Sequence, residues 1–110
     1  MTFMPTAMAD PAHVATIRQQ NDDFRRSLTG GTVALSASII ALGDANQARI
    51  IAAVQAFDDF DDDPWDAHDI GDIEVEVEEP GIATWTELVF FRIDRFATGP
   101  VLTLMLAQEW

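Results

Sequence analysis

The sequence predicts an α+β fold in which two helices pack on one face of a mostly antiparallel sheet of about four strands, in the order α-β-α-β-β-β. Three observations support this class: two segments with helical spacing of apolar residues, one segment that alternates between acidic and apolar residues, and three further β-prone segments. With 110 residues and 48% hydrophobic content, the chain is expected to form a single domain, residues 1–110, with a hydrophobic core.

Two segments have the pattern of amphipathic helices. A flexible leader is expected over residues 1–9, followed by a helix over about residues 11–28 that has Asp10 as its N-cap and a proline in its first turn. A Gly-Gly pair stops this helix. A second helix is predicted over about residues 45–57, with Asp44 as its N-cap and with Ile and Val residues on one stripe.

The remaining segments read as strands. Residues 32–36 are β-prone, and residues 38–42 either continue this strand or begin a helical turn. Residues 72–78 alternate strictly between acidic residues and Ile or Val, which predicts a strand with one face on the core. A Glu-Pro-Gly turn then leads to a second strand over residues 85–93, so the two strands form a hairpin. Residues 101–107 are nearly all apolar, which predicts a strand buried on both faces or a short core helix.

Acidic residues are concentrated in one part of the chain. The 19 Asp and Glu residues outnumber the 6 Arg residues, Lys and Cys are absent, and the net charge is −13. Residues 58–79 contain 12 carboxylates among 22 residues and no Lys or Arg. Nucleic acid and anionic membranes attract Lys and Arg clusters, so we expect this protein to bind neither of them directly. The N-terminus lacks the pattern of a signal peptide, so we expect a cytoplasmic protein. We also expect that the protein has no cofactor.

The four carboxylates of the 72–78 strand share one face. Their spacing of about 6.6–6.8 Å is comparable to that of neighbouring phosphates on a nucleic-acid strand. An acidic loop predicted over residues 58–71 adds further charge, so the combined surface would attract the basic groove of a nucleic-acid-binding protein. Trp65 either anchors such a partner or folds back onto the core, as Phe57 and Phe60 are expected to do. The candidate partner-binding residues are Asp58, Asp59, Asp61, Asp62, Asp63, Trp65, Asp66, Asp69, Asp72, Glu74, Glu76, Glu78 and Glu79.

Other interpretations of this segment stay open. A polar outer face is common in antiparallel sheets, and acidic edges deter aggregation. Asp66, His68 and Asp69 are residue types that bind hard metals or zinc, although the calcium-loop pattern in this segment fails at Pro64 and Ile70. No nucleophile-plus-base motif is present, so we do not expect an enzyme.

Several blocks of sequence resemble a known family. They are NDDFR at 21–25, LTGG at 28–31, AAVQAFDDF at 52–60, DPWDAHDIG at 63–71, FRID at 91–94 and LTLMLA at 102–107. In these blocks, over about residues 14–110, the chain is similar to the family catalogued as domain of unknown function 3768. The acidic loop is shorter than is usual there, and Arg95 and Phe96 replace a tyrosine pair. The resemblance implies a small alphaproteobacterial protein, often carried on plasmids and other mobile elements, without established catalytic residues.

A mobile-element setting makes the acidic-surface hypothesis more concrete. The predicted function is an acidic DNA or RNA mimic that inhibits a basic nuclease, in an anti-CRISPR or anti-restriction role. Arg18, Arg25 and Arg26 would then supply internal counter-charge or a second interaction edge. The alternative is a small accessory or regulatory protein-binding module of a plasmid system, antitoxin-like, in which the charge serves solubility. A metal-dependent enzyme is the third possibility.

Overall fold

The structure, a computed structural model, describes residues 11–60 and 67–109. Its elements are α2 (Pro11–Ser27), β1 (Thr32–Leu35), α3 (Ala37–Ala41), α4 (Asp44–Ala56), β2 (Ile70–Glu79), β3 (Ala83–Phe96), β4 (Gly99–Leu106) and the 3₁₀ helix η1 (Ala107–Glu109). The predicted N-cap Asp10 and the leader before it lie outside the described residues.

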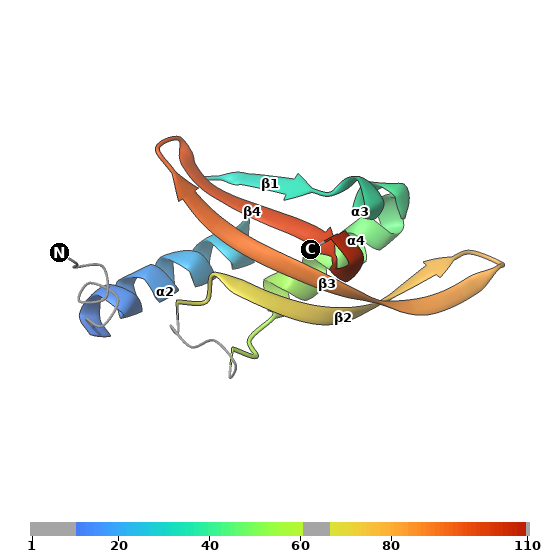
Figure 1. The fold of residues 1–110 in the computed structure, drawn as a ribbon, viewed down its shortest axis with the longest axis horizontal. Helices are drawn as coiled ribbons and strands as arrows, with labels where there is room; N and C mark the ends of the chain where they lie inside the picture. Colours follow the sequence, from blue (N-terminus) through green and yellow to red (C-terminus); the bar gives the residue numbers. More distant parts are fainter. Residues whose placement is uncertain (1–10, 61–66, 110) are drawn as a thin grey trace.

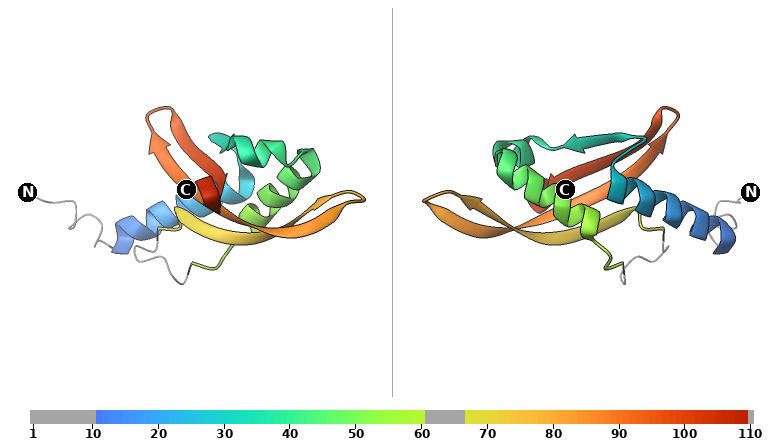
Figure 2. Two further views of the ribbon diagram at one scale, coloured as in Figure 1. Left: turned by 45° about the vertical axis from the view of Figure 1, so that its right-hand side comes forward. Right: turned by 180° about the vertical axis from the view of Figure 1, so that it is seen from behind.

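The strands form one sheet in the order β1-β4-β3-β2. β2 and β3 pair antiparallel, as do β3 and β4, whereas β1 runs parallel to β4. Figure 1 looks onto the sheet face that carries no helix, and the rear view in Figure 2 shows the helices in front of the sheet. This arrangement confirms the predicted α+β class with a mostly antiparallel sheet. Within the described residues, no helix has both the length and the apolar character needed to cross a membrane.

The core lies between the helices and one face of the sheet, here called the inner face. Alternate residues of β2, β3 and β4 point inward, which is the period-two pattern of a strand with one buried face. The buried residues that form the core cluster are Phe24, Ile39, Ile50, Val54, Val75, Val77, Val89, Phe91, Ile93, Leu102, Leu104 and Leu106. Phe57 and Phe60 pack against this cluster, as predicted.

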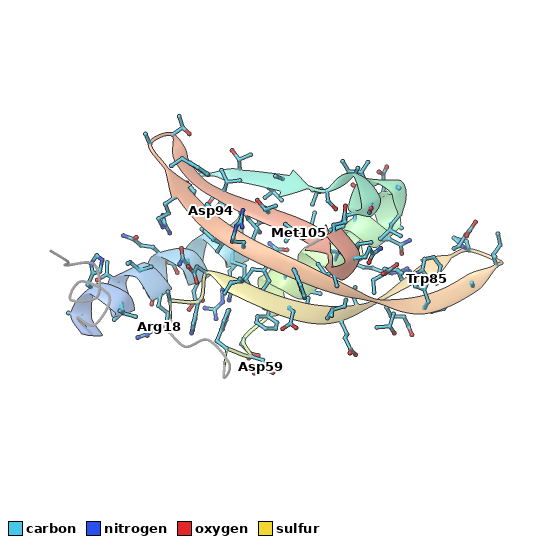
Figure 3. The ribbon with its side chains drawn as sticks, viewed as in Figure 1. Arg18, Asp59, Trp85, Asp94 and Met105 are labelled. Atoms are coloured by element: carbon cyan, nitrogen blue, oxygen red, sulfur yellow. The ribbon has the colours of Figure 1, made fainter. Side chains whose placement is uncertain are left out.

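Strand β4 differs from its prediction as a strand buried on both faces. Its Leu residues at 102, 104 and 106 are buried, whereas Val101, Thr103 and Met105 are only half-buried on the other face. The reason is that α2, α3 and α4 all contribute their buried residues to the inner face. The opposite face, here called the outer face, is the one on which Asp94 and Met105 are visible in Figure 3.

The structure decides one prediction that allowed two alternatives and moves two predicted boundaries. The segment 38–42, left open between strand and helix, forms α3 because the Ser36 side chain accepts a hydrogen bond from the Ile39 N–H and caps it. The N-cap of α4 is Gly43, with φ of +92°, and Asp44 is the first helical residue. The predicted loop 58–71 is shorter at its end because β2 begins at Ile70.

Gly71 is expected to be intolerant of a side chain. A Cβ atom at this position would lie 2.5 Å from Cε2 of Phe91 and 3.0 Å from Cε2 of Phe57. Because Phe91 is fully buried, its ring has little room to move. We expect Gly71→Ala to lower the free energy of unfolding by about 1–3 kcal/mol, measured by urea denaturation. The cost should shrink in a Phe91→Leu background, and an equal cost in both backgrounds would rule out this clash as the cause.

Candidate functional site

Three carboxylates of β2 form a continuous exposed row on the outer face. Asp72, Glu74 and Glu76 are all exposed, and we call them the acidic row. Their directly opposed neighbours on β3 are uncharged, because Asp72 pairs with Phe90, Glu74 with Leu88 and Glu76 with Thr86. No cation of the neighbouring strand therefore lies directly opposite these charges, and the predicted alternation of residues 72–78 is confirmed in these positions.

The far end of the row lies on a projecting arm. β4 pairs with β3 only as far as the Val89–Leu106 pair, whereas β2 continues to pair with β3 as far as the Glu79–Ala83 pair. The hairpin therefore extends beyond the rest of the sheet as a two-stranded arm, visible in Figure 1. Glu74 and Glu76 lie on this arm, where the third strand of the sheet is no longer beside them.

Glu78 does not join the row as the period-two pattern predicts. Its carboxylate forms an ion pair with Arg49 of α4, with Oε1 and Nη2 2.7 Å apart. Its backbone N–H donates to Oδ1 of Asn46, and its carbonyl accepts from Nδ2 of the same side chain. Glu78 is thus tied to α4, and its negative charge is partly compensated. Glu79 is exposed beside the turn, where its carbonyl accepts from the Ile82 N–H.

The loop residues of the candidate set are only partly described. Asp58 and Asp59 are exposed just beyond the end of α4, and Figure 3 labels Asp59 on the connection that leaves this helix. Asp69 is half-buried, and its carbonyl accepts a hydrogen bond from the Ile93 N–H at 2.7 Å. The predicted partner residues Asp61, Asp62, Asp63, Trp65 and Asp66 lie outside the described residues.

A buried arginine, for which the sequence predicted internal counter-charge or a second interaction edge, connects α2 with the end of α4. The Arg25 side chain is fully buried, and its Nε and Nη2 donate to the carbonyls of Val54 and Phe57 at 3.1 and 2.9 Å. Its Nη1 forms an ion pair with Asp22 at 2.9 Å, and its guanidinium lies 5.0 Å from the centre of the Phe60 ring. The last carbonyls of a helix lack partners within the helix, so Arg25 acts as a C-terminal cap for α4.

The same cluster holds the chain where it returns toward β2. Nδ1 of His68 lies 3.0 Å from Oδ1 of Asp22, and its ring stacks on Phe60 with centroids 3.8 Å apart. Asn21 donates to the Ala67 carbonyl and accepts from Arg95. Sequence reasoning considered His68 as a metal ligand, but here its Nδ1 contacts Asp22. Within residues 11–60 and 67–109, no three His, Cys, Asp or Glu residues are grouped in a way that could hold a metal.

Asp22 should make the protein sensitive to acid. Burial alone would raise the pKa of Asp22, but hydrogen bonds from His68 and Arg25, with the positive charges of these groups, outweigh burial and lower it. A lowered pKa stabilises the fold above the pKa of the unfolded chain, and this contribution is lost as pH falls through the folded value. Asp22→Asn should cost about 1–3 kcal/mol at pH 5. We expect this difference from the native chain to shrink toward pH 3 in urea denaturation, whereas a constant difference would contradict the assignment.

One hollow of about 430 Å³ lies between the hairpin arm and the junction of α3 and α4. Leu42, Asn46, Glu79 and Trp85 are among the residues that line it. The polar atoms of Asn46 are already bonded to Leu42, Arg49 and Glu78, and the indole N–H of Trp85 donates to Glu87. Asn46 and Trp85 therefore have few hydrogen-bonding atoms left for a ligand in this hollow. The acidic row is the stronger candidate for a binding site.

Comparison with known proteins identifies the family. A family model described as "Protein of unknown function (DUF3768)" matches residues 35–100, which run from the end of β1 to the start of β4 and include the acidic row. This match is narrower than the resemblance over residues 14–110, and the blocks at 21–25, 28–31 and 102–107 lie outside it. No curated protein and no solved structure matches the chain. Because the matched segment covers more than half of the chain, the protein belongs to the DUF3768 family, as its sequence blocks predicted.

Proposed function

We propose that the protein binds a basic nucleic-acid-binding protein through the acidic row and acts as an inhibitor that occupies the groove for nucleic acid. In its most concrete form, the partner is a restriction or CRISPR nuclease. The observation that carries this proposal is the row itself: three exposed carboxylates on one face of one strand, with uncharged residues directly opposite. Such a row presents its charge to solvent and to a partner.

Electrostatic range supports a combined action of these charges. Alternate residues of a strand are about 6.6–6.8 Å apart, which is shorter than the Debye length of about 8 Å at physiological ionic strength. The potentials of neighbouring row members therefore add, and a net charge of −13 reinforces them at longer range. A basic groove would be drawn to this face quickly, and the attraction would weaken as salt is added.

A second candidate function is favoured by exposed apolar residues of β3. Leu88 is 37% exposed and lies directly opposite Glu74, and Phe96 near the end of β3 is 60% exposed. A partner that contacts such residues would bind mainly by burial of apolar surface, with little dependence on salt. The protein would then be an accessory or regulatory module, and its charge would serve solubility.

A capture experiment with competition separates the two functions. The immobilised chain is incubated with host lysate at about 0.1 M and about 0.5 M salt, with and without duplex DNA as competitor. The inhibitor proposal expects a nucleic-acid-binding protein that is retained at low salt, is released by salt or DNA, and loses its own nucleic-acid binding when the chain is added. Capture that is indifferent to both salt and DNA would contradict the proposal and favour the accessory module.

A further inference from the structure

Within residues 11–60 and 67–109, strand β2 forms a long free edge of the sheet. It is the last strand in the order β1-β4-β3-β2 and has 10 residues, whereas β1 at the opposite edge has 4. The outward N–H and C=O groups of an edge strand can pair with another extended chain. Short edge strands are one way in which proteins avoid such pairing, and β2 does not use it.

Contacts at the two ends of β2 show which residues direct their backbone toward this edge. At one end, the N–H of Ile93 donates to the carbonyl of Asp69, so odd-numbered residues of this segment face β3. At the other end, both backbone groups of Glu78 bond to Asn46 of α4, so even-numbered residues face away from β3. The register is unbroken between these ends. The backbone groups of the acidic row therefore point to the free edge.

Asn46 already shows how a peptide-like group pairs with this edge. Its side-chain amide accepts from the Glu78 N–H at 3.0 Å and donates to the Glu78 carbonyl at 2.8 Å, which is the pattern of a residue in an added strand. Asn46 is 4% exposed, so this pairing is part of the packed structure. Among the described residues, no hydrogen bond from outside the sheet reaches the backbone of Asp72, Glu74 or Glu76, whereas Glu78 has those to Asn46.

We infer that this edge, along the acidic row, is a strand-addition site for an extended basic segment of the partner. The inference rests on the proposed function and adds a binding mode to it. In an added strand, alternate side chains would lie on the outer face beside the carboxylates of the row. Lys or Arg at alternate positions would be favoured there, since opposite charges across neighbouring strands stabilise their pairing.

The same charges argue against other occupants of the edge. A second copy of β2 would place carboxylates beside carboxylates, which is destabilising. The other edge of the hairpin arm belongs to β3, whose residues Thr84 and Thr86 carry no charge to select a basic segment. Charge complementarity therefore selects both the edge and the chemistry of the segment.

The test uses synthetic peptides of about eight residues that alternate Lys and Val, in the manner of known strand-addition ligands. Three forms carry the same charge: unmodified, N-methylated on every Lys, and N-methylated on every Val. In an added strand, only every second N–H group of the peptide can face β2. With the Lys side chains beside the carboxylates, these are the Lys N–H groups if the peptide pairs antiparallel and the Val N–H groups if it pairs parallel. We expect one methylated peptide to bind like the unmodified one and the other to bind roughly tenfold or more weakly, because several hydrogen bonds are lost.

The outcomes separate the inference from the proposed function. Equal binding of all three peptides would show attraction by charge alone, which would overturn strand addition and leave the acidic row as an electrostatic site. Failure of all three to bind, or self-association of the chain through β2 in light scattering, would also overturn the inference. The proposed function is judged independently by the capture experiment with salt and DNA.

A matched pair of variants tests the edge from the side of the protein. Glu74→Pro and Glu74→Gln remove the same charge, but only proline removes the outward N–H group. Proline is tolerated on edge strands where the N–H faces solvent, and circular dichroism and a melting curve would verify the fold of both variants. We expect the proline variant to bind the unmodified peptide roughly tenfold more weakly than the glutamine variant. Equal affinities would overturn the inference.

Discussion

Replacing Arg25 with Met should lower the free energy of unfolding by about 3–5 kcal/mol, which is a large part of the stability of a small domain. The Arg25 side chain is fully buried and bonds to the carbonyls of Val54 and Phe57 and to the carboxylate of Asp22. Methionine would fill much of the space but would leave the Phe57 carbonyl without this donor and the Val54 carbonyl with only the Phe57 N–H. A buried polar group that loses its partner bears the full cost of leaving water.

The adjacent Arg26 provides a matched control, because it has the same charge and helix but is exposed. In urea denaturation at pH 7, Arg26→Met should change the free energy of unfolding by less than about 0.5 kcal/mol. Arg25→Lys should retain the charge but still lose most of the stabilisation that Arg25 contributes. A lysine side chain lacks the planar guanidinium that reaches two carbonyls and a carboxylate together. If Arg25→Met and Arg26→Met proved equally stable, the C-terminal capping of α4 by Arg25 would be wrong.

Arg25 also marks a limit of prediction from the sequence. Its three hydrogen bonds reach Asp22 in the same helix but also Val54 and Phe57, which lie far along the chain. The sequence interpretation assigned the arginines of this helix to internal counter-charge or to a second interaction edge, and for Arg25 the structure supports the first. Only the packing of α2 against the end of α4 decides between them, and no local pattern contains that information.

Local patterns succeeded where one face of an element meets the core. The alternation over residues 72–78 predicted a strand, because burying Val75 and Val77 forces the acidic residues onto the other face. The same pattern failed for Glu78, whose side chain reaches Arg49 and whose backbone is held by Asn46. Both partners come from α4, so the loss of the fourth row member depends on tertiary structure. The parallel pairing of β1 with β4 was likewise not predictable from either strand alone.

Neutralising Glu74 and Glu76 should weaken capture of the basic partner by about 10- to 100-fold at low salt, and this loss should be smaller at high salt. The pair Glu74→Gln and Glu76→Gln removes two neighbouring charges of the acidic row. The pair Asp23→Asn and Asp44→Asn changes the net charge equally, but these exposed residues lie on α2 and α4, in the helical layer. We expect this control pair to change the affinity by less than about threefold, since surface charges outside an interface contribute little.

Comparing the two variant pairs tests whether binding depends on the position of the negative charges or only on the net charge of the protein. Both variant pairs reduce the net charge by the same amount, so a purely solubilising or long-range role predicts the same small effect for both. A role in direct contact predicts a large effect only for the row, together with a weaker dependence of affinity on salt. Unfolding measurements complete the test, because removing like charges from one strand face relieves repulsion and should leave the free energy of unfolding unchanged or higher. Equal weakening by both pairs would therefore take the partner-binding role away from the acidic row.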